Sequence, residues 1–279
     1  MGADCFYAMG KTHTVCQDYA AVRKMDRSIR MALSDGCSSS PHTDIGARVL
    51  ARRSLWGEHD LDFVDPLWDS SHRLITSLGL PRESLDATLL VADIDSREVN
   101  LSIIGDGVVD VEHEDPTAVV FTVLPQLFPT PPIVNARQGS STTRLDVDFP
   151  SGAPAYLRYM YREDFEAYAK QFGTERRVNG VPTIVTQGTL GLRWTYPRAG
   201  LRRVSLYSDG VRSFRRPGAA PGTWEPVPLA EVLEQINAIK VPAGEFLVRR
   251  MQKFLHDFCP KHGWVHDDDV AVATYLETP

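Results

Sequence analysis

Three apolar runs in this sequence each end in an aspartate followed by glycine. The pairs are Asp35-Gly36, Asp106-Gly107 and Asp209-Gly210. A β-strand that stops at such a pair leaves a carboxylate at the edge of the sheet. The glycine lets the backbone turn through positive φ, which brings its carbonyl oxygen close to whatever the carboxylate binds. The same dipeptide is also common in hairpin turns, and that simpler interpretation fits each pair taken alone.

Two further acidic sites favour a chemical interpretation of the pattern. The run from Asp267 to Asp269 stands immediately before the alternating stretch 270–275, and Asp18 lies in a short segment that begins another predicted strand. We therefore expect carboxylates at five strand ends. Carboxylate and carbonyl oxygens are the ligands that hard divalent cations such as Mg²⁺ and Mn²⁺ prefer. The sequence thus predicts a metal site built from the ends of strands.

The order of these residues resembles that of the metal-dependent Ser/Thr protein phosphatases of type 2C. The resemblance extends from about residue 8 to residue 276, and residues 124–200 carry no motif of the family. The matched segments are, in chain order, 13–18, 32–36, 86–90, 104–107, 208–210 and 268–269.

The resemblance implies roles for the residues in these segments. Asp35 would bridge two Mn²⁺ or Mg²⁺ ions, and the Gly36 carbonyl would bind one of them. Asp209 and Asp268 would complete the site of the other ion. Asp106, together with Asp209, resembles the weaker third metal site of bacterial members.

Asp268 is selected as the ligand because the family has a ligand, then Asn or Asp, and then an apolar strand. Its neighbours Asp267 and Asp269 are expected to be a solvated run.

The first and central motifs contain three more implied site residues and three departures from the family, and Gln17 and His13 are both. Asp18 would act in catalysis by orienting metal-bound water. Gln17 stands where the family often has a metal-binding glutamate, and its amide oxygen would bind metal without adding charge. His13 stands where many members have an arginine that holds the substrate phosphate, which a histidine does only when protonated. The alternative for His13 is a turn residue with a hydrogen-bonded ring. Cys37 stands where eukaryotic members have a histidine proposed as general acid.

Arginines form two further groups in the sequence. Those around the Asp209 turn are candidates for attracting a phosphorylated substrate, because a guanidinium matches phosphate oxygens. These are Arg202, Arg203, Arg212, Arg215 and Arg216. A second group, Arg48, Arg52 and Arg53, is expected on the solvated face of a helix.

The resemblance implies an α+β fold, a four-layer α-β-β-α sandwich in which two central, mostly antiparallel sheets are flanked by helix pairs. Periodicity is compatible with it and predicts a helix capped by Asp44, a second helix from Pro66 to Gly79 and an antiparallel meander over 86–123. Further strands are predicted near 5–9, 17–23, 29–34, 142–149, 154–160, 203–208 and 270–276, and helices near 162–171, 228–238 and 243–258. We expect one domain over residues 1–279, with a variable, flap-like region at about 124–200.

Composition excludes several other classes of protein. The 279 residues are 43% hydrophobic and carry a net charge of −6, which argues against a nucleic-acid partner. Four scattered cysteines and the lack of a signal segment favour the cytoplasm, and no apolar stretch is long enough to span a membrane. We expect a monomer whose partner is a phosphorylated protein. The motifs of serine hydrolases and of phosphate-binding loops are absent from the sequence.

Residues 256–266 contain one cysteine and three histidines at spacings that a zinc site can use. They also fit the end of an amphipathic helix, which is the interpretation we favour.

The sequence thus predicts a Mn²⁺- or Mg²⁺-dependent hydrolase of phosphoserine and phosphothreonine in proteins. The alternative is a catalytically weak or inactive type 2C-like module that senses phosphorylation or acts as a scaffold. Joint retention of Asp35, Asp209 and Asp268 favours the enzyme.

Overall fold

The computed structural model describes residues 2–56, 64–113, 121–123, 133–138, 141–146, 177–178, 181–182 and 192–277. The elements predicted at 154–160 and 162–171 lie outside these residues, as does most of the flap-like region. The expectation of a single domain stays a prediction.

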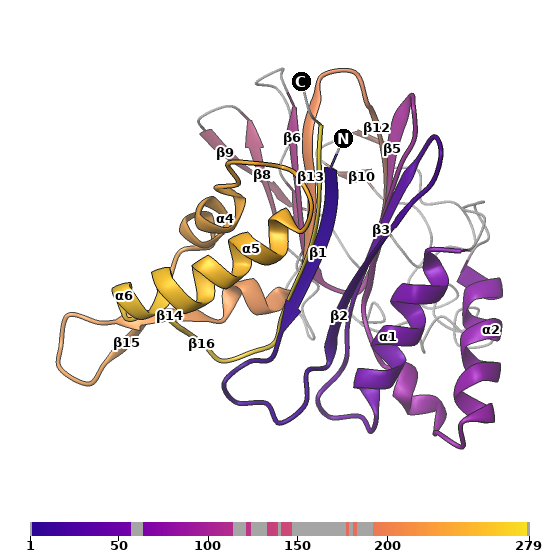
Figure 1. The fold of residues 1–279 in the computed structure, drawn as a ribbon, viewed down its shortest axis with the longest axis horizontal. Helices are drawn as coiled ribbons and strands as arrows, with labels where there is room; N and C mark the ends of the chain where they lie inside the picture. The colour runs from indigo at the N-terminus through magenta and orange to yellow at the C-terminus, as the bar shows by residue number, and fades with distance from the viewer. Residues whose placement is uncertain are drawn as a thin grey trace.

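Two antiparallel sheets stack face to face (Figure 1). The larger sheet has seven strands, in the order β1 (Gly2–Ala8), β17 (Val270–Leu276), β13 (Leu201–Tyr207), β6 (Gly107–His113), β7 (Phe121–Val123), β8 (Ile133–Gln138) and β9 (Ser141–Asp146). The smaller has five, in the order β12 (Leu192–Pro197), β5 (Glu98–Ile104), β4 (Leu89–Ile94), β3 (Ile29–Asp35) and β2 (Asp18–Lys24). Two minor sheets are formed by β10 (Arg177–Val178) with β11 (Val181–Pro182), and by β15 (Trp224–Pro226), β14 (Phe214–Pro217) and β16 (Val265–His266).

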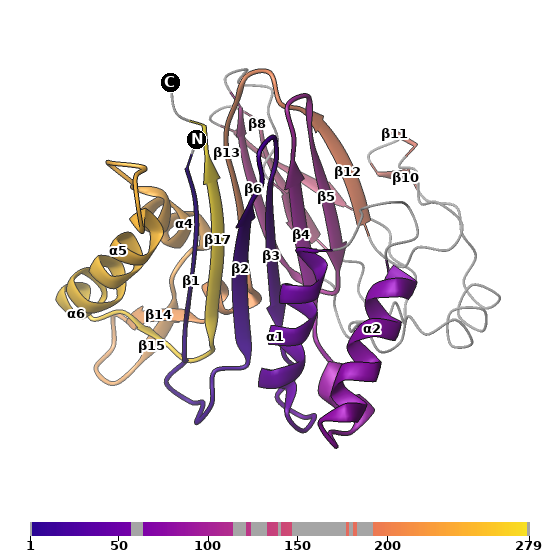
Figure 2. The same ribbon diagram turned by 45° about the vertical axis from the view of Figure 1, so that its right-hand side comes forward.

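Helices cover the outer face of each large sheet (Figures 1 and 2). The five-stranded sheet is covered by α1 (Thr43–Ser54) and α2 (Val64–Ser77), followed by the short 3₁₀ helix η1 (Arg82–Leu85). The seven-stranded sheet is covered by α4 (Leu229–Asn237), α5 (Phe246–Gln252), the π-helical segment η4 (Lys253–Phe258) and α6 (Cys259–His262). The predicted α+β sandwich with helices on both faces is therefore confirmed.

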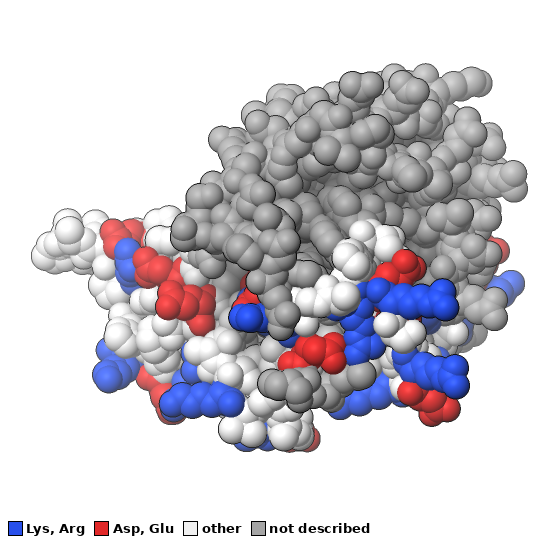
Figure 3. Space-filling view, turned by 90° about the horizontal axis from the view of Figure 1, so that it is seen from above, with Lys and Arg blue, Asp and Glu red and all other residues white. Residues whose placement is uncertain are grey.

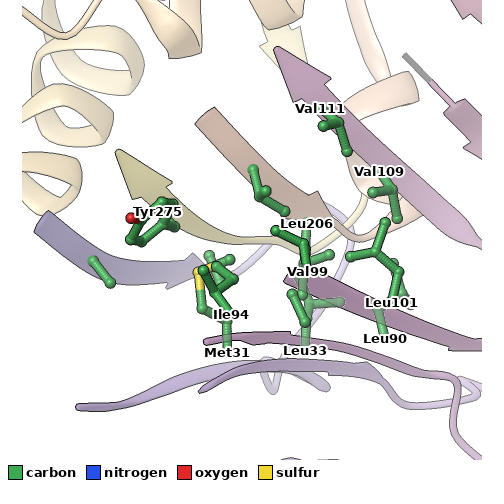
Figure 4. Packing of buried hydrophobic residues seen from close by; sticks show 14 of the residues in the cluster. Met31, Leu33, Leu90, Ile94, Val99, Leu101, Val109, Val111, Leu206 and Tyr275 are labelled. Carbon is green, nitrogen blue, oxygen red and sulfur yellow. The ribbon is translucent and has the colours of Figure 1, made fainter. Parts of the chain in front are cut away.

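The core between the sheets follows from alternation along the strands. Met31 and Leu33 on β3 point toward the other sheet, whereas Ala32 between them packs under the helices. Figure 4 shows Leu206 and Tyr275 of the seven-stranded sheet packing against this layer. Because both faces of β3, β4 and β17 are covered, these strands are almost continuously buried and mostly apolar, and a carboxylate at a strand end stands out from them.

The predicted meander is wrong at one point. β4 and β5 pair with each other, but β6 belongs to the other sheet and pairs with β13 and β7. The chain crosses between the sheets at Gly105-Asp106-Gly107, where φ is 79° at Gly105 and 143° at Gly107. Residues with a side chain rarely adopt these values, so the two glycines permit the crossing. As a result, Asp106 lies between the sheets instead of at the tip of a hairpin.

The two N-terminal helices largely match their predictions. α2 contains Pro66 in its first turn and is followed by Gly79 at a φ of 70°, as expected. The predicted cap of α1 is wrong, because His42 occupies the cap position and Asp44 lies in the first turn. There its charge is favourable to the helix dipole.

In the described residues, no helix has the length and apolar character needed to cross a membrane. On the face drawn in Figure 3, the described Lys and Arg residues are interspersed with Asp and Glu, and neither sign forms a continuous field.

Candidate metal centre

The inner faces of β2 and β3 end in carboxylates. The register of the two strands places Asp18 directly opposite Asp35. Asp18 lies on the same face of β2 as Ala20, and Asp35 on the same face of β3 as Leu33, and both apolar residues belong to the core between the sheets. The two carboxylates therefore terminate the inner face of the five-stranded sheet.

The seven-stranded sheet brings its acidic residues to the same place. Asp209 follows β13 and begins the 3₁₀ helix η3 (Asp209–Arg212), and Asp268 stands two residues before β17. The charge of Asp209 acts on all four of the other predicted carboxylates, namely Asp18, Asp35, Asp106 and Asp268. The structure thus brings together all five aspartates predicted from the sequence, with Asp209 as their common neighbour.

Burial and mutual repulsion raise the pKa values of four of these carboxylates, those of Asp18, Asp35, Asp106 and Asp268. Burial raises the pKa of Asp18 to about 7, and the charges of Asp269 and Asp209 add to it, against hydrogen bonds with Ser208 and Asp35. Burial and the charge of Asp209 likewise raise the pKa of Asp106 to about 7. The pKa of Asp35 is raised well above its usual range by burial and then by the charges of Asp18 and Asp209. Such a group of carboxylates is costly to ionise unless a cation joins it.

The donor set fits a hard divalent cation. The Oδ2 oxygen of Asp18 is buried and has no hydrogen-bond partner in the described part of the chain. Among the described residues, no three His, Cys, Asp or Glu side chains are already grouped as a set that could hold a metal ion. The five carboxylates therefore influence one another's charge without forming a ready-made metal cluster in the described part of the chain.

Two of the three predicted glycines act differently from the expectation. Gly36 and Gly210 do not have positive φ. A Cβ atom at Gly36 would lie 2.8 Å from the Thr43 carbonyl oxygen, and one at Gly210 only 1.7 Å from that of Asp269. Glycine is required at both positions because another part of the backbone approaches too closely to leave room for a side chain. The turn after Asp35 thus packs against the start of α1, and the turn after Asp209 packs against Asp269.

The segment 86–90 supports the turn that carries Asp35. The Thr88 amide donates to the Asp35 carbonyl oxygen at 2.8 Å, and the Asp35 amide donates to Thr88 Oγ1 at 3.1 Å. Buried Asp86 accepts the Ser40 hydroxyl at 2.6 Å, and its carbonyl oxygen accepts the Cys37 amide at 2.8 Å. The segment 86–90 therefore holds the backbone at Asp35 and at Cys37, before and after Gly36.

Gln17 lies next to Asp18, with its side chain directed toward α1. Its Nε2 donates to Thr43 Oγ1 at 2.8 Å, and that hydroxyl donates to the Cys37 carbonyl oxygen at 3.0 Å. The Gln17 carbonyl oxygen also accepts the Gly36 amide at 3.2 Å. Its role as a metal ligand stays a prediction.

Asp269 corrects the expectation of a solvated run. It is only 2% exposed, and its two carboxylate oxygens each accept a backbone N–H at 2.6 Å, from Gly10 and from Gln17. The signal that could have identified it is strand parity, because Asp269 shares the inner face of β17 with Ala271 and Ala273. The Asp267 carbonyl oxygen accepts both the amide and the hydroxyl of Thr12, so the whole 9–17 loop is bound to the start of β17.

The ring of His13 lies between two carboxylates. Its Nδ1 is 3.0 Å from Asp269 Oδ2, and its Nε2 is 3.3 Å from Asp268 Oδ1. Burial opposes protonation of His13, but its pKa is raised overall by the hydrogen bond with Asp269 and the charges of Asp269, Asp268 and Asp18. The ring is therefore held by close contacts with two carboxylates, which fits the simpler interpretation of a turn residue. Its role in holding phosphate stays a prediction.

Most arginines around Asp209 are already paired. Arg203 pairs with Asp110 and Glu112, Arg215 with Asp267, and Arg216 with Glu225 and Glu231. Exposed Arg212, in contrast, is close enough to Asp106 for its charge to lower the pKa that burial and Asp209 raise. Of this group, Arg212 is the one that the structure places at the carboxylates.

The residues 256–266 that a zinc site could use pack as the end of a helix. Cys259 is buried at the start of α6, and Phe258 stacks on His262 with ring centroids 4.2 Å apart. His266 stacks on Phe214, and its Nδ1 is 3.0 Å from the Asp268 carbonyl oxygen. The helix-end interpretation is confirmed.

No protein-family model and no curated protein sequence matches this chain. Solved structures match over nearly its whole length. A bacterial serine phosphatase aligns with a TM-score of 0.50 at 9% identity, covering 99% of each chain. A mutant of a bacterial serine phosphatase aligns with a TM-score of 0.51 at 10% identity, covering 100% of this chain and 99% of the other. A Caenorhabditis elegans sex-determining protein aligns with a TM-score of 0.50 at 14% identity, covering 99% of this chain and 65% of the other. At these identities, the likeness shows that the chain has the fold of bacterial serine phosphatases.

Proposed function

We propose that this chain is a metal-dependent phosphoprotein phosphatase that hydrolyses phosphoserine and phosphothreonine. The observation that carries the proposal is the gathering of five aspartates from both sheets, where burial and neighbouring carboxylates raise the pKa values of Asp18, Asp35, Asp106 and Asp268. A fold needs no such group for its stability, because uncompensated buried charge lowers stability. Perturbed carboxylates between two sheets are instead typical of a functional site.

The proposed ligands are the carboxylates of Asp35, Asp209 and Asp268 and the carbonyl oxygen of Gly36, with Asp106 at a weaker additional position. Two Mn²⁺ or Mg²⁺ ions bound there would supply an activated water and polarise the phosphoryl oxygens. These residues supply the negative charge and the oxygen atoms that such ions require.

The remaining residues would act on the water and on the phosphate. Asp18, with its unpartnered Oδ2 oxygen, is suited to accept a hydrogen bond from water and so to orient it. Exposed Arg212 lies near Asp106, where its guanidinium can bind a phosphate oxygen. His13 would balance part of the negative charge through Asp268 and Asp269.

The test is turnover of p-nitrophenyl phosphate and of a phosphoserine peptide in Mn²⁺, with and without a chelator. We expect turnover that the chelator abolishes and that Asp209→Asn lowers at least about 100-fold, some 2.7 kcal/mol in the barrier. Chelator-resistant turnover, or an Asp209→Asn variant with near wild-type rates, would overturn the proposal.

One observation favours a catalytically weak relative as a second candidate. Gln17 adds no charge to the site, and its amide is bound to Thr43. Such a protein would bind the phosphoserine peptide in a metal-dependent manner without hydrolysing it. Equilibrium binding measured beside turnover distinguishes the two candidates.

A further inference from the structure

A basic and aromatic surface lies beside the candidate metal centre. We name it the Tyr19 patch, and it consists of Tyr7, Tyr19, Arg48 and Arg52. The Tyr7 and Tyr19 rings have centroids 5.0 Å apart. The guanidinium carbons of Arg48 and Arg52 lie 5.7 and 5.8 Å from the centre of the Tyr19 ring, within cation–π range. Arg52 Nε also donates to the Tyr19 hydroxyl at 2.9 Å.

The patch carries positive charge that is ordered but not neutralised. Elsewhere, Arg30, Arg198 and Arg203 are each paired with a carboxylate. Neither Arg48 nor Arg52 has a carboxylate within ion-pair distance in the described part of the chain, and both side chains are exposed. Their exposure on α1 agrees with the expected solvated helix face, and the contacts with Tyr19 hold both side chains in place.

The geometry of Arg52 suits an anionic ligand. Its Nε donates a hydrogen bond to the Tyr19 hydroxyl, and this bond fixes the plane of the guanidinium. The two terminal nitrogens remain as a pair of parallel donors, the arrangement that binds a carboxylate or phosphate with two hydrogen bonds. Because the ring and the hydroxyl already hold the side chain, less conformational entropy is lost on binding.

The patch lies next to the carboxylates along one strand. Tyr19 directly follows Asp18 on β2, but it points to the opposite face, toward α1. Burial raises the pKa of Cys16 to about 12, and the charge of Arg48 opposes that rise, so Arg48 lies near Cys16, two residues before Asp18. A peptide that crosses the end of β2 would reach both sites. At about 3.3 Å per residue, three residues of extended peptide span about 10 Å.

We propose that the Tyr19 patch binds an acidic segment of the phosphoprotein substrate, a few residues from the phosphorylated side chain. This inference rests on the proposed function. The chain as a whole carries a charge of −6, which disfavours an acidic partner, so local positive charge is needed to bind one. Arg48 and Arg52 provide it, and the exposed ring of Tyr7 provides apolar contact for the peptide, while buried Tyr19 holds the two arginines in place.

The test compares two phosphoserine peptides that differ only in three flanking residues, aspartate in one and glutamine in the other. We expect wild-type protein in Mn²⁺ to bind the acidic peptide more tightly by fluorescence anisotropy. The double variant Arg48→Ala/Arg52→Ala should lose about tenfold in affinity for the acidic peptide and at most about twofold for the neutral one. Its turnover of p-nitrophenyl phosphate should equal that of wild type. Raising the salt concentration should reduce the preference of the wild type for the acidic peptide.

The matched control is Arg27→Ala/Arg73→Ala, which removes two exposed arginines from the turn between β2 and β3 and from α2. It should keep the wild-type preference. An equal loss in both double variants would mean that only the overall charge matters and would overturn the inference. So would an equal loss for both peptides in the Arg48/Arg52 variant.

A smaller change tests the geometry. Tyr19→Phe keeps the ring but removes the hydroxyl that orients Arg52, so we expect a two- to threefold loss for the acidic peptide only. Binding decides the inference independently of turnover. A wild-type protein that binds the acidic peptide through the patch without hydrolysing it would contradict the proposed enzyme and still support the patch.

Discussion

Among the described residues, Asp110 and the aspartates of the candidate metal centre are two sets of carboxylates with opposite surroundings. Asp110 on β6 is 4% exposed and receives Arg203 Nη2 and Asn237 Nδ2, each at 2.9 Å, while the Tyr207 hydroxyl donates to Asn237 at 2.7 Å. Asp18 on β2 is 2% exposed, yet the charges nearest to it are those of other aspartates. The first carboxylate is neutralised by its surroundings, and the second is not.

This comparison distinguishes a carboxylate that stabilises the fold through its partners from carboxylates that would be neutralised by a bound cation. A paired buried charge recovers its desolvation cost from its partner, whereas like charges add to that cost. In this chain the unneutralised group lies at strand ends between the sheets, and the neutralised one lies under helix α4. Four experiments test whether this separation is functional.

The largest effect should be on turnover. Asp35→Asn keeps the shape of the side chain but removes a charge from the centre of the metal group, so we expect phosphatase activity to fall at least about 1,000-fold, some 4 kcal/mol in the barrier. Asp110→Asn makes the same chemical change in the other group and should leave kcat/KM within about threefold. Similar losses in both variants, measured on p-nitrophenyl phosphate in Mn²⁺, would remove the distinction between the groups.

Stability without metal should show the reverse pattern. Asp110→Asn leaves Arg203 without its closest charge partner, and we expect a loss of about 3 kcal/mol in the free energy of unfolding. Asp35→Asn relieves repulsion and should gain about 1 kcal/mol, or roughly 2 to 4 °C in Tm. Chemical denaturation in the presence of a chelator measures both. A destabilised Asp35→Asn variant would show that this carboxylate holds the fold together.

A smaller effect should come from Asp269. Its carboxylate binds the 9–17 loop, and this loop leads directly to Asp18 in the candidate metal centre. In Asp269→Asn, one of the backbone N–H groups of Gly10 and Gln17 loses its acceptor. We expect Mn²⁺ affinity to fall about tenfold by titration calorimetry and the amides of both residues to exchange faster with solvent. The control is Asp267→Asn, whose carboxylate pairs with Arg215 at the surface. Unchanged amide exchange at Gly10 and Gln17 would show that Asp269 does not hold the 9–17 loop in place.

The last effect should be on the pH dependence of stability. In the folded chain the pKa values of Asp18 and Asp106 are about 7, against about 3.9 when unfolded. Between these values the unfolded chain binds fewer protons, so the stability of the metal-free protein should fall as pH rises from about 4 to about 7. The raised pKa of His13 acts in the same direction above about pH 6.5. Thermal melts should show this slope, and Asp18→Asn should flatten it; a flat wild-type profile would contradict the repulsion.

Much of the site could be predicted because its residues interrupt a strong pattern. Asp18, Asp35 and Asp209 end apolar strands, and a charged residue at the end of a buried face needs an explanation that the strand itself does not supply. The sandwich of two sheets was predicted from the same strands together with the family resemblance. Order along the chain was sufficient for these features.

The features that were missed depend on contacts between distant segments. The crossing at Gly105-Asp106-Gly107 has the sequence of a hairpin turn, and only the pairing of β6 with β13 shows otherwise. The hydrogen bonds of Asp269 join it to Gly10, which is 259 positions away in the sequence, and to Gln17, which is 252 positions away. The Tyr19 patch requires the relative placement of β1, β2 and α1. Local periodicity does not encode any of these distances.

The pairing of the first strand with the last has a consequence for how the protein folds. β1 and β17 are neighbours along their whole length, from Gly2 opposite Leu276 to Ala8 opposite Val270, and Figure 2 shows the two chain ends side by side. During synthesis, β1 emerges long before its partner exists, and Asp268 and Asp269 emerge only just before β17. Neither this edge of the larger sheet nor the group of five aspartates can therefore be complete until the chain has been made as far as β17. Contacts this distant in sequence also slow folding.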